Sequence, residues 1–451
     1  MTDQVTPTFG SRFVTEPIPK YEVPEKGMDP RVAYHLIHDE LATQGNPTMN
    51  MSSFVTTVMD EECDRLISEN LGVNYIDTEV YRANLEIQNR CVRMLNDLYN
   101  APDPEKAWGM ECIGSSEALI LSLLTHKRAW EEKRKAEGKP YDNPNIVMGN
   151  DVHLAWNKGA MYFDIEQKLI PLKPGQYTIT PADVVERVDE NTIMVVGVLG
   201  TSYTFEYDPI EEINDALVKV KNERGLDIPL HVDGASGAFI APFVDPDLKW
   251  DFQLEQVNSI NVSGHKYGLV YPGMGWALWR NESDVPQSLV TETNVLGFVE
   301  KSFSINFSRG GAMILAQYYN LIRLGREGYT QIQSAMRDNA RYLVDGVRKT
   351  GRFEIINDAT HTPCCCCHLK DESKWNGADL VGELAKHGWV IPAFTLPPDA
   401  ETVTAIRMNV KETFSRDMAD KLLADLDAAI KHLDATHTSP QRQVQDRGHH
   451  H

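Results

Sequence analysis

The order of hydrophobic and polar residues between positions 84 and 280 predicts alternating helices and strands. Amphipathic spacing is typical of helices at 84–98 and 116–135, with further helices expected near 181–188 and over 210–224. Continuous short apolar runs predict strands at 146–148, 193–199, 229–232 and 260–263. Strands that are apolar on both faces and separated by helices indicate a parallel sheet covered on both sides. An additional strand over 274–279 is expected at an edge of this sheet.

The two ends of the chain have different patterns. Residues 1–47 are punctuated by prolines and contain one expected helix, at 31–42, which predicts an N-terminal arm that packs on a neighbour. Towards the C-terminus, helices are expected at 314–326, 331–349 and 416–433, and strands at 353–356, 364–369, 390–393 and 404–410. We therefore expect an arm (1–47), a large α/β domain (48–336) and a small C-terminal α+β domain (337–451).

Composition and charge limit the classes of partner. With 42% hydrophobic and 24% charged residues, the 451-residue chain has the composition of a globular protein. The formal net charge of -21 argues against nucleic acid and anionic membranes as partners. Because the chain has neither an apolar run of membrane-spanning length nor a secretion signal pattern, we expect a cytoplasmic location and no membrane partner.

Four of the seven cysteines are consecutive, at Cys364–Cys367. An odd number of cysteines without a secretion signal argues against a disulfide framework. Consecutive residues of a strand point to opposite faces, so these four thiols cannot converge on one metal ion. We interpret the run as a buried strand and expect no metal site. The three final histidines, an expression tag or a natural tail, are left out of the site.

A lysine and an aspartate at the ends of two apolar strands indicate the chemistry. Lys266 follows the strand 260–263, where burial can keep its amine partly neutral and able to attack an aldehyde. Asp233 ends the strand that begins near Pro229. A lysine that holds an aldehyde and a carboxylate that keeps a pyridine nitrogen protonated are what pyridoxal 5′-phosphate requires of a protein.

Other residues of these loops suit the same cofactor. Ser115 and Ser116 open a long helix, where hydroxyl and backbone N–H groups can hold a phosphate; a plain helix cap is the alternative interpretation. Ser202, like Asp233 and Lys266, follows a predicted strand end, so one crevice can hold all three. The remaining candidates are Ala235 and His153 against the ring, and Ser263 and His265 near the phosphate.

Several longer strings resemble those of one enzyme family. They are Gly45-Asn46-Pro47, Asn74-Tyr75-Ile76-Asp77, Gly114-Ser115-Ser116-Glu117-Ala118, His231-Val232-Asp233, Ser263-Gly264-His265-Lys266-Tyr267-Gly268, Asn306-Phe307-Ser308-Arg309 and Pro392-Ala393-Phe394-Thr395. Together they resemble plant and bacterial glutamate decarboxylases, group II pyridoxal-phosphate-dependent decarboxylases, over almost the whole chain. The resemblance implies transferase fold type I, with a mostly parallel seven-stranded sheet in the large domain.

The resemblance also implies roles for individual residues. Lys266 would hold the cofactor aldehyde, with Ser115, Ser116, Ser263 and His265 on its phosphate and Ser308 reaching that phosphate from a neighbouring subunit. The expected ligands of the substrate are Arg407 for the α-carboxylate, Ser53 and Phe54 for the distal carboxylate, and Asn74 with Asp77 across the interface. These enzymes are at least dimers with shared active sites and often hexamers, which implies a homo-oligomer here.

Two positions depart from the family pattern in ways that bear on function. Val295 stands where relatives usually carry a tyrosine that donates a proton to Cα. Water or His265 would have to take that role, or protonation elsewhere or reaction with oxygen would give slower turnover or abortive side reactions. His153 replaces a glutamine found on the ring face in many members. The tail 439–447 lacks the tryptophan and basic helix of plant relatives, so calmodulin is not supported as a partner.

The leading hypothesis is decarboxylation of L-glutamate to 4-aminobutanoate and carbon dioxide. A decarboxylase of a related acidic amino acid such as aspartate is the nearest alternative, since a single methylene separates the substrates. A cysteine desulfurase would use one of Cys364–Cys367 as a persulfide carrier. A slow or non-catalytic relative that acts as an assembly subunit gains support from Val295.

Overall fold

The structure, a computed structural model, describes residues 15–293 and 300–436. The chain forms two compact units, residues 1–50 and 51–451. The first unit contains α1 (Pro30–Leu41), which confirms the helix expected at 31–42. Pro30 occupies the first turn, and the Asp29 carboxylate caps the helix by accepting a hydrogen bond from the N–H group of Arg31. The domain boundaries at 47 and 336 stay a prediction.

A seven-stranded sheet forms the centre of the second unit, in the order β1-β7-β6-β5-β4-β2-β3. Its strands are β1 (Trp108–Cys112), β2 (Asn145–Gly149), β3 (Glu166–Ile170), β4 (Thr192–Val198), β5 (Leu230–Asp233), β6 (Val257–Ser263) and β7 (Gly275–Trp279). β6, β5, β4, β2 and β3 are neighbours in this order and pair in parallel. β7 is antiparallel to both of its neighbours. The predicted α/β class with a mostly parallel sheet is confirmed.

The expectation that the strand at 274–279 lies at an edge is wrong. β7 pairs with β6 on one side and with β1 on the other, so β1 forms the edge. Sequence reasoning missed β1 because Gly109 and Glu111 interrupt its apolar pattern. It also missed β3, whose residues are only partly buried at the opposite edge. Edge strands need no continuous apolar run because only part of their surface is covered.

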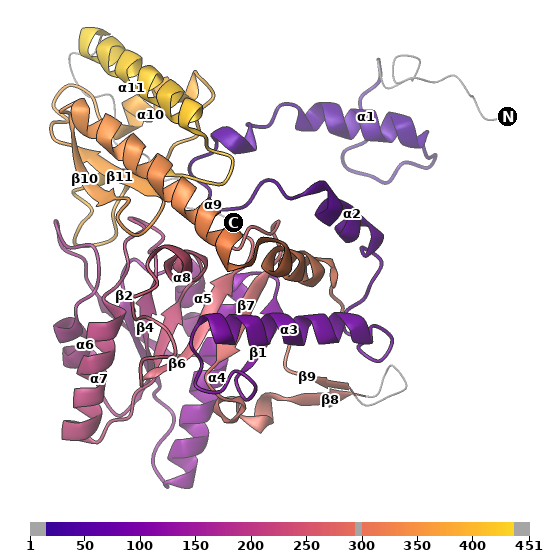
Figure 1. Ribbon diagram of the computed structural model, residues 1–451, viewed down its shortest axis with the longest axis vertical. Coiled ribbons are helices and arrows are strands. Elements are labelled where there is room, and N and C mark those ends of the chain that lie inside the picture. The colour runs from indigo at the N-terminus through magenta and orange to yellow at the C-terminus, as the bar shows by residue number, and fades with distance from the viewer. Residues whose placement is uncertain (1–14, 294–299, 437–451) are drawn as a thin grey trace. The chain divides into compact units, whose positions relative to one another are not determined.

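Helices cover both faces of this sheet (Figure 1). The helices of this part of the chain are α2 (Glu61–Glu69), α3 (Arg82–Leu98), α4 (Ser115–Ala136), α5 (Leu154–Tyr162), α6 (Pro181–Arg187), α7 (Ile210–Arg224) and α8 (Ala241–Val244). Alternate residues of β1 show which helix lies on which face. Met110 packs with Ala118 and Leu121 of α4, whereas a side chain at Gly109 would point at Val92 of α3. The sheet is therefore enclosed, as its continuous apolar strands predict.

The C-terminal part contains a four-stranded antiparallel sheet in the order β10-β11-β13-β12. Its strands and helices are β10 (Phe353–Asp358), β11 (Cys364–Leu369), β12 (Ala393–Thr395), β13 (Thr404–Asn409), α10 (Gly377–Ala385) and α11 (Arg416–Thr436). The long α9 (Ala312–Lys349), which is broken at Gly325, leads from the large sheet to this one (Figure 1). A separate pair, β8 (Thr291–Thr293) and β9 (Glu300–Ser302), is antiparallel.

The cysteine run forms the predicted strand, whereas another strand is displaced. Cys364–Cys367 occupy β11, and all four are buried and free of disulfides. Burial raises the pKa of Cys364 and Cys366 far above the usual thiol range. The strand expected at 390–393 is found instead at β12, and Val390 forms only an isolated bridge.

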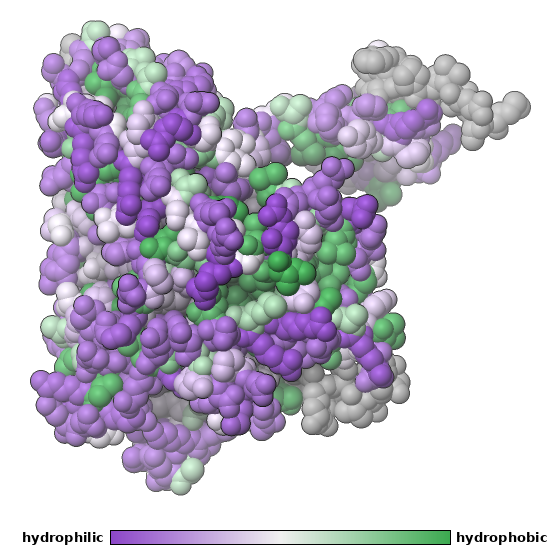
Figure 2. Space-filling model, viewed as in Figure 1, coloured by the Kyte–Doolittle hydropathy of each residue, from purple (hydrophilic) through white to green (hydrophobic). Residues whose placement is uncertain are grey.

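The visible surface is mostly hydrophilic, as the composition leads one to expect (Figure 2). Within 15–293 and 300–436, no helix combines the length and the apolar character that a membrane crossing requires.

Candidate active site

Lys266 lies in the loop after β6, with its amine in a buried environment. Its Nζ lies 3.2 Å from the Ser236 hydroxyl oxygen and 5.2 Å from the centre of the Phe54 ring. Burial lowers the pKa of Lys266 from 10.5 to about 8; the positive charge of Arg407 adds to this effect and Asp233 opposes it. The amine is therefore far more nucleophilic at neutral pH than that of an exposed lysine.

Asp233 ends β5 and is held by donors on both carboxylate oxygens. Its Oδ2 accepts a hydrogen bond of 2.8 Å from the indole N–H group of Trp156. Its Oδ1 accepts hydrogen bonds from the Asn261 side chain (2.9 Å) and from the backbone N–H group of Ala235 (3.1 Å). Only 3% of Asp233 is exposed, so these donors offset the cost of burying a carboxylate.

The start of α4 provides a site suited to an anion. No described side chain caps this helix, whose first turn begins with Ser115 and Ser116, so its N–H groups are open to a ligand. Gly114 makes this approach possible: its φ is +150°, and a Cβ there would meet His265 Cε1 at 2.9 Å. Ser263 is fully buried, and its hydroxyl has no partner among the described residues.

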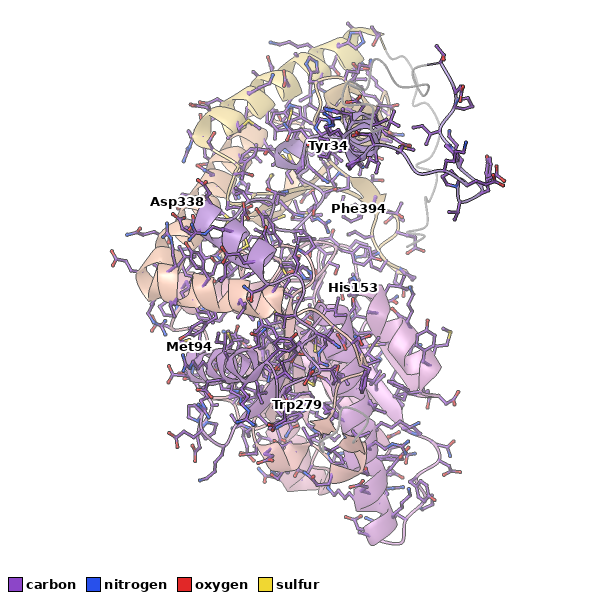
Figure 3. All side chains as sticks on the ribbon, turned by 90° about the vertical axis from the view of Figure 1, so that its right-hand side faces the viewer. Tyr34, Met94, His153, Trp279, Asp338 and Phe394 are labelled. Atoms are coloured by element: carbon purple, nitrogen blue, oxygen red, sulfur yellow. The ribbon has the colours of Figure 1, made fainter. Side chains whose placement is uncertain are left out.

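The start of α4, His153 before α5 and the loop after β6 line one cavity of about 460 Å³, whereas Asp233 and Ser263 are not part of its lining. Its lining includes Ser115, Ser116, His153, His265 and Lys266. His153 caps α5 by accepting the N–H group of Ala155 on its Nδ1, and Figure 3 shows its position. His265 Nδ1 accepts the N–H group of Met274 at 3.4 Å, and burial lowers the pKa of His265 to about 4. The ring is therefore neutral near pH 7, with its proton on Nε2.

Arg407 reaches the same region from β13. Its guanidinium donates to the carbonyl groups of Ser202, Tyr203 and Ser52, while its Nε has no partner in the described part of the chain. It lies 4.6 Å from the ring centre of Phe54. Arg407 is buried, with 8% of its surface exposed. It nevertheless forms no ion pair with any described carboxylate. A buried guanidinium without a counter-ion is suited to an anionic ligand.

The segment 51–57 connects Lys266 to the four-stranded sheet. Thr56 donates its hydroxyl proton to the carbonyl oxygen of Lys266 at 2.6 Å, and Met51 accepts the backbone N–H group of Asn409 in β13 at 3.0 Å. The hydroxyl of Ser53, a predicted substrate ligand, accepts the N–H group of Val55. Phe54, between these anchors, is therefore held against both cationic side chains.

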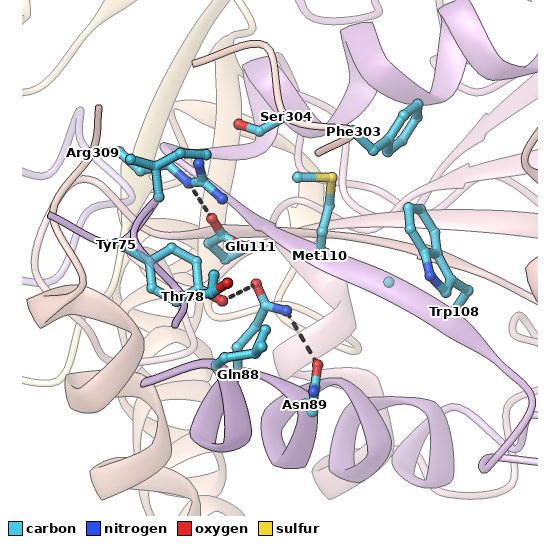
Figure 4. Close-up of a pocket in the computed structure, with 13 residues that line it drawn as sticks. Tyr75, Thr78, Gln88, Asn89, Trp108, Met110, Glu111, Phe303, Ser304 and Arg309 are labelled. Atoms are coloured by element: carbon cyan, nitrogen blue, oxygen red, sulfur yellow. Dashed lines mark hydrogen bonds and ion pairs between the residues drawn. The ribbon is translucent and has the colours of Figure 1, made fainter. Parts of the chain in front are cut away.

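Three predicted residues lie elsewhere in this chain. Asn74 pairs with the backbone at Gly310, and neither Asn74, Asp77 nor exposed Ser308 lines the cavity at Lys266. Their neighbours in the sequence, among them Tyr75, Thr78 and Arg309, line a second cavity of about 220 Å³, shown in Figure 4, where Arg309 pairs with buried Glu111. Burial raises the pKa of Glu111 to about 7 although Arg309 opposes this effect. Their predicted contact with a neighbouring subunit stays a prediction.

Sequence reasoning missed several residues that support the site. Trp156 and Asn261 hold Asp233, Ser236 contacts the amine of Lys266, and Phe394 packs 5.4 Å from Arg407 (Figure 3). For Asn261 a signal existed, because an amide inside a continuous apolar strand requires a buried partner. Trp156 carried no such signal, since a buried tryptophan is commonly a core residue.

The residues present fit pyridoxal 5′-phosphate. The open N–H groups of α4 suit its phosphate, the amine of Lys266 its aldehyde, and the carboxylate of Asp233 its ring nitrogen. The hydroxyl of Ser263 has no partner among the described residues, so it can bind an additional polar group. Gly114 lies close to His265 because it has no side chain, which leaves room for such a group. This combination on a mostly parallel sheet defines the class of pyridoxal-phosphate enzymes of fold type I.

Comparison with known proteins agrees with this class. Residues 24–370 match the family described as pyridoxal-dependent decarboxylase conserved domain. A glutamate decarboxylase of Solanum lycopersicum is 47% identical over 96% of this chain and 86% of its own length. One of Aliivibrio fischeri is 44% identical over 95% and 93%, respectively. A solved Lactobacillus brevis glutamate decarboxylase has a TM-score of 0.91 and 37% identity over 97% of this chain and 99% of its own.

The chain belongs to the pyridoxal-dependent decarboxylase family, and its relatives at 40–47% identity are glutamate decarboxylases. The predictions of a pyridoxal-phosphate cofactor, an amino-acid decarboxylase and fold type I are thereby confirmed. The cysteine desulfurase alternative loses its basis, because Cys364–Cys367 are buried in β11 and none lines the cavity. Val295 lies outside the described residues, so its effect stays a prediction.

Proposed function

We propose that the protein decarboxylates L-glutamate to 4-aminobutanoate and carbon dioxide. One observation carries this proposal: the buried guanidinium of Arg407, without an ion-pair partner among the described residues, shares the Phe54 ring with the amine of Lys266. An amino acid whose α-carboxylate pairs with Arg407 would bring its amine close to the position of Lys266 Nζ.

The cofactor, when bound, supplies an electron sink for the electron pair left at Cα after loss of carbon dioxide. Asp233 holds a proton on the ring nitrogen and Lys266 holds the aldehyde. Arg407 would bind the α-carboxylate of the substrate and thereby select the bond from Cα to that carboxylate for cleavage. Phe54 keeps water away from both cations, which strengthens their interactions with the substrate.

The proton that replaces the carboxylate at Cα needs a donor. His265 lines the cavity beside Lys266 and, as a neutral ring, carries its proton on Nε2. We propose His265 or water as this donor, since Val295 has no ionisable proton. Replacing Val295 with Tyr tests this step: a faster turnover with fewer aldehyde by-products would show that the donor limits the reaction.

The other assignments belong to the same proposal. Ser115, Ser116, Ser263 and His265 hold the phosphate, His153 and Ala235 lie against the ring, and Ser202 lies beside Arg407. Ser308, Asn74 and Asp77 serve the site of a neighbouring subunit in a homo-oligomer of at least two and up to six chains. Ser53 and Phe54 contact the distal carboxylate. The cytoplasmic location stays a prediction.

A direct assay tests the reaction. The holoenzyme is incubated with L-glutamate, and 4-aminobutanoate, carbon dioxide and aldehyde by-products are quantified together. Equal amounts of the first two are expected. The same assay with L-aspartate separates the nearest alternative, and faster turnover of aspartate would replace glutamate as the proposed substrate. Borohydride reduction followed by peptide mapping should label Lys266; a label elsewhere, or none, contradicts the assignment.

A further inference from the structure

Behind Asp233, two neighbouring central strands carry a ladder of polar residues. In β5, His231 and Asp233 are two residues apart and share a face, as do Ser259 and Asn261 in β6. The parallel register pairs His231 with Ser259 and Asp233 with Asn261. All four are at most 3% exposed, although the strands around them are apolar. Four polar side chains in such a place require mutual hydrogen bonds.

These hydrogen bonds form one continuous chain that ends at Asp233. His126 Nε2 of α4 lies 2.7 Å from the hydroxyl oxygen of Ser259, which lies 2.7 Å from His231 Nδ1. His231 Nε2 lies 2.7 Å from Asn261 Oδ1. The amide nitrogen of Asn261 then donates to Asp233 Oδ1 at 2.9 Å. We call His126, Ser259, His231 and Asn261 the donor chain.

Only one arrangement of protons satisfies every contact in the donor chain. An ionised carboxylate only accepts, so Asn261 presents its amide nitrogen to Asp233 and its oxygen to His231. Nε2 of His231 must then carry the proton, which leaves Nδ1 to accept the Ser259 hydroxyl. Ser259 in turn accepts the Nε2 proton of His126. Every donor along the chain points towards Asp233.

Burial keeps both histidines neutral, as this arrangement needs. Desolvation lowers the pKa of His126 to about 3, and His231 adds to this effect. Desolvation also lowers the pKa of His231 to about 4, opposed by its hydrogen bond to Asn261 and by the charge of Asp233. The negative charge of Asp233 also acts on Lys266, whose pKa it raises against the effect of burial. Aligned neutral donors stabilise a carboxylate without adding a charge that would compete with a ring cation.

We propose that the donor chain is a set of positioning residues that hold the carboxylate of Asp233 in place and orient its free lone pair towards the ring nitrogen of the cofactor. Trp156 anchors Oδ2 on the other side and contacts His231 ring to ring at 5.1 Å, so the carboxylate cannot rotate freely. Each residue acts through the next rather than on the cofactor. The inference rests on the proposed placement of the ring nitrogen at Asp233.

The test compares two ligands in variants that interrupt the donor chain. One ligand is pyridoxal phosphate, and the other is an analogue in which a C–H group replaces the ring nitrogen. Ser259→Ala removes the central hydroxyl, and His231→Gln keeps an Nε2-like donor to Asn261 but loses the acceptor for Ser259. Ser122→Ala is the matched control: it deletes an equally buried hydroxyl that bonds only to its own helix, one turn before His126.

We expect Ser259→Ala to lower the preference for pyridoxal phosphate over the analogue about five- to ten-fold, the size expected for one hydrogen bond in a polar network. His231→Gln should have a smaller effect, and Ser122→Ala should keep the wild-type ratio. In parallel, NMR of isotopically labelled ring nitrogen in the bound cofactor should show a lower pKa of that nitrogen in Ser259→Ala. Thermal unfolding of each apoenzyme reports any loss of folding separately.

The outcomes separate the inference from the placement on which it rests. Wild-type protein that binds both ligands equally well would overturn the placement of the ring nitrogen at Asp233, and the inference with it. Wild-type protein that prefers pyridoxal phosphate, with an unchanged ratio and nitrogen pKa in Ser259→Ala and His231→Gln, would overturn the donor chain alone. If Ser259→Ala failed to fold, His231→Gln would decide by the same two measurements.

Discussion

The amine of Lys266 and the guanidinium of Arg407 lie against the same aromatic ring, at 5.2 and 4.6 Å from the centre of Phe54. The positive charge of Arg407 lowers the pKa of Lys266, in addition to the larger effect of burial. The face of the Phe54 ring attracts cations, which partly offsets the repulsion between the two positive charges. The pair is thus arranged to receive an anion at Arg407 and to keep the amine of Lys266 reactive.

The first prediction concerns the rate at which the apoenzyme takes up its cofactor. Attack on the aldehyde needs the neutral amine, whose fraction rises as the pH passes through a folded-state pKa of about 8 rather than 10.5. Uptake should therefore accelerate from pH 7 to pH 9. Arg407→Gln removes a charge that lowers this pKa, so its profile should move to higher pH; stopped-flow absorbance measures both. Arg341→Gln on α9 is the control, and an identical shift there would contradict the explanation.

The second prediction concerns substrate binding by Arg407. Arg407→Lys keeps the charge but loses the planar fork that can bind a carboxylate with two parallel hydrogen bonds. We expect kcat/KM for L-glutamate to fall about 100-fold, the order of two lost charge-assisted hydrogen bonds, with affinity for pyridoxal phosphate unchanged. Steady-state kinetics and cofactor titration separate the two effects. Equal losses of kcat/KM and of affinity for pyridoxal phosphate would mean that the substitution disturbs the fold of the site instead.

The third prediction concerns Gly114 at the start of α4. In Gly114→Ala the new methyl group would meet His265, and a φ of +150° is strained for alanine. The variant should lose about 1–3 kcal/mol of stability and bind pyridoxal phosphate more weakly. Gly382→Ala in α10 is the matched control, since a methyl group there would meet no atom within 4 Å and alanine favours a helix. In thermal unfolding and cofactor titration, Gly382→Ala should have the stability and the cofactor affinity of the wild type.

The fourth prediction concerns the seven thiols, all of which are buried. Burial raises the pKa of Cys91 and of Cys364, and that of Cys63 to about 11, so thiolates are scarce near pH 7. A thiol reagent should label the native protein slowly and all seven cysteines quickly once urea unfolds it. Mass spectrometry of the labelled peptides gives the count. Rapid labelling of Cys364–Cys367 in the native protein would contradict this prediction and support a role for these thiols in catalysis.

The local chemistry of this protein can be read from its amino-acid order alone. It predicts Lys266, Asp233 and the serines of α4 at element ends because continuous apolar runs mark buried strands, and polar residues mark the points where they stop. The same reasoning places Cys364–Cys367 in a buried strand. The spacing of apolar residues, and the burial that it indicates, depend on residues that are neighbours in the chain. A single sequence therefore shows them directly.

Which of these residues come into contact depends on the three-dimensional fold. Strand order moved β7 from the expected edge to a place between β1 and β6, and pairing of β5 with β6 joined His231 and Asn261 into a chain behind Asp233. Arg407 reached Phe54 across more than three hundred positions of sequence. Such contacts depend on long-range pairing, whose free energy comes from packing and burial of distant segments that no local pattern contains.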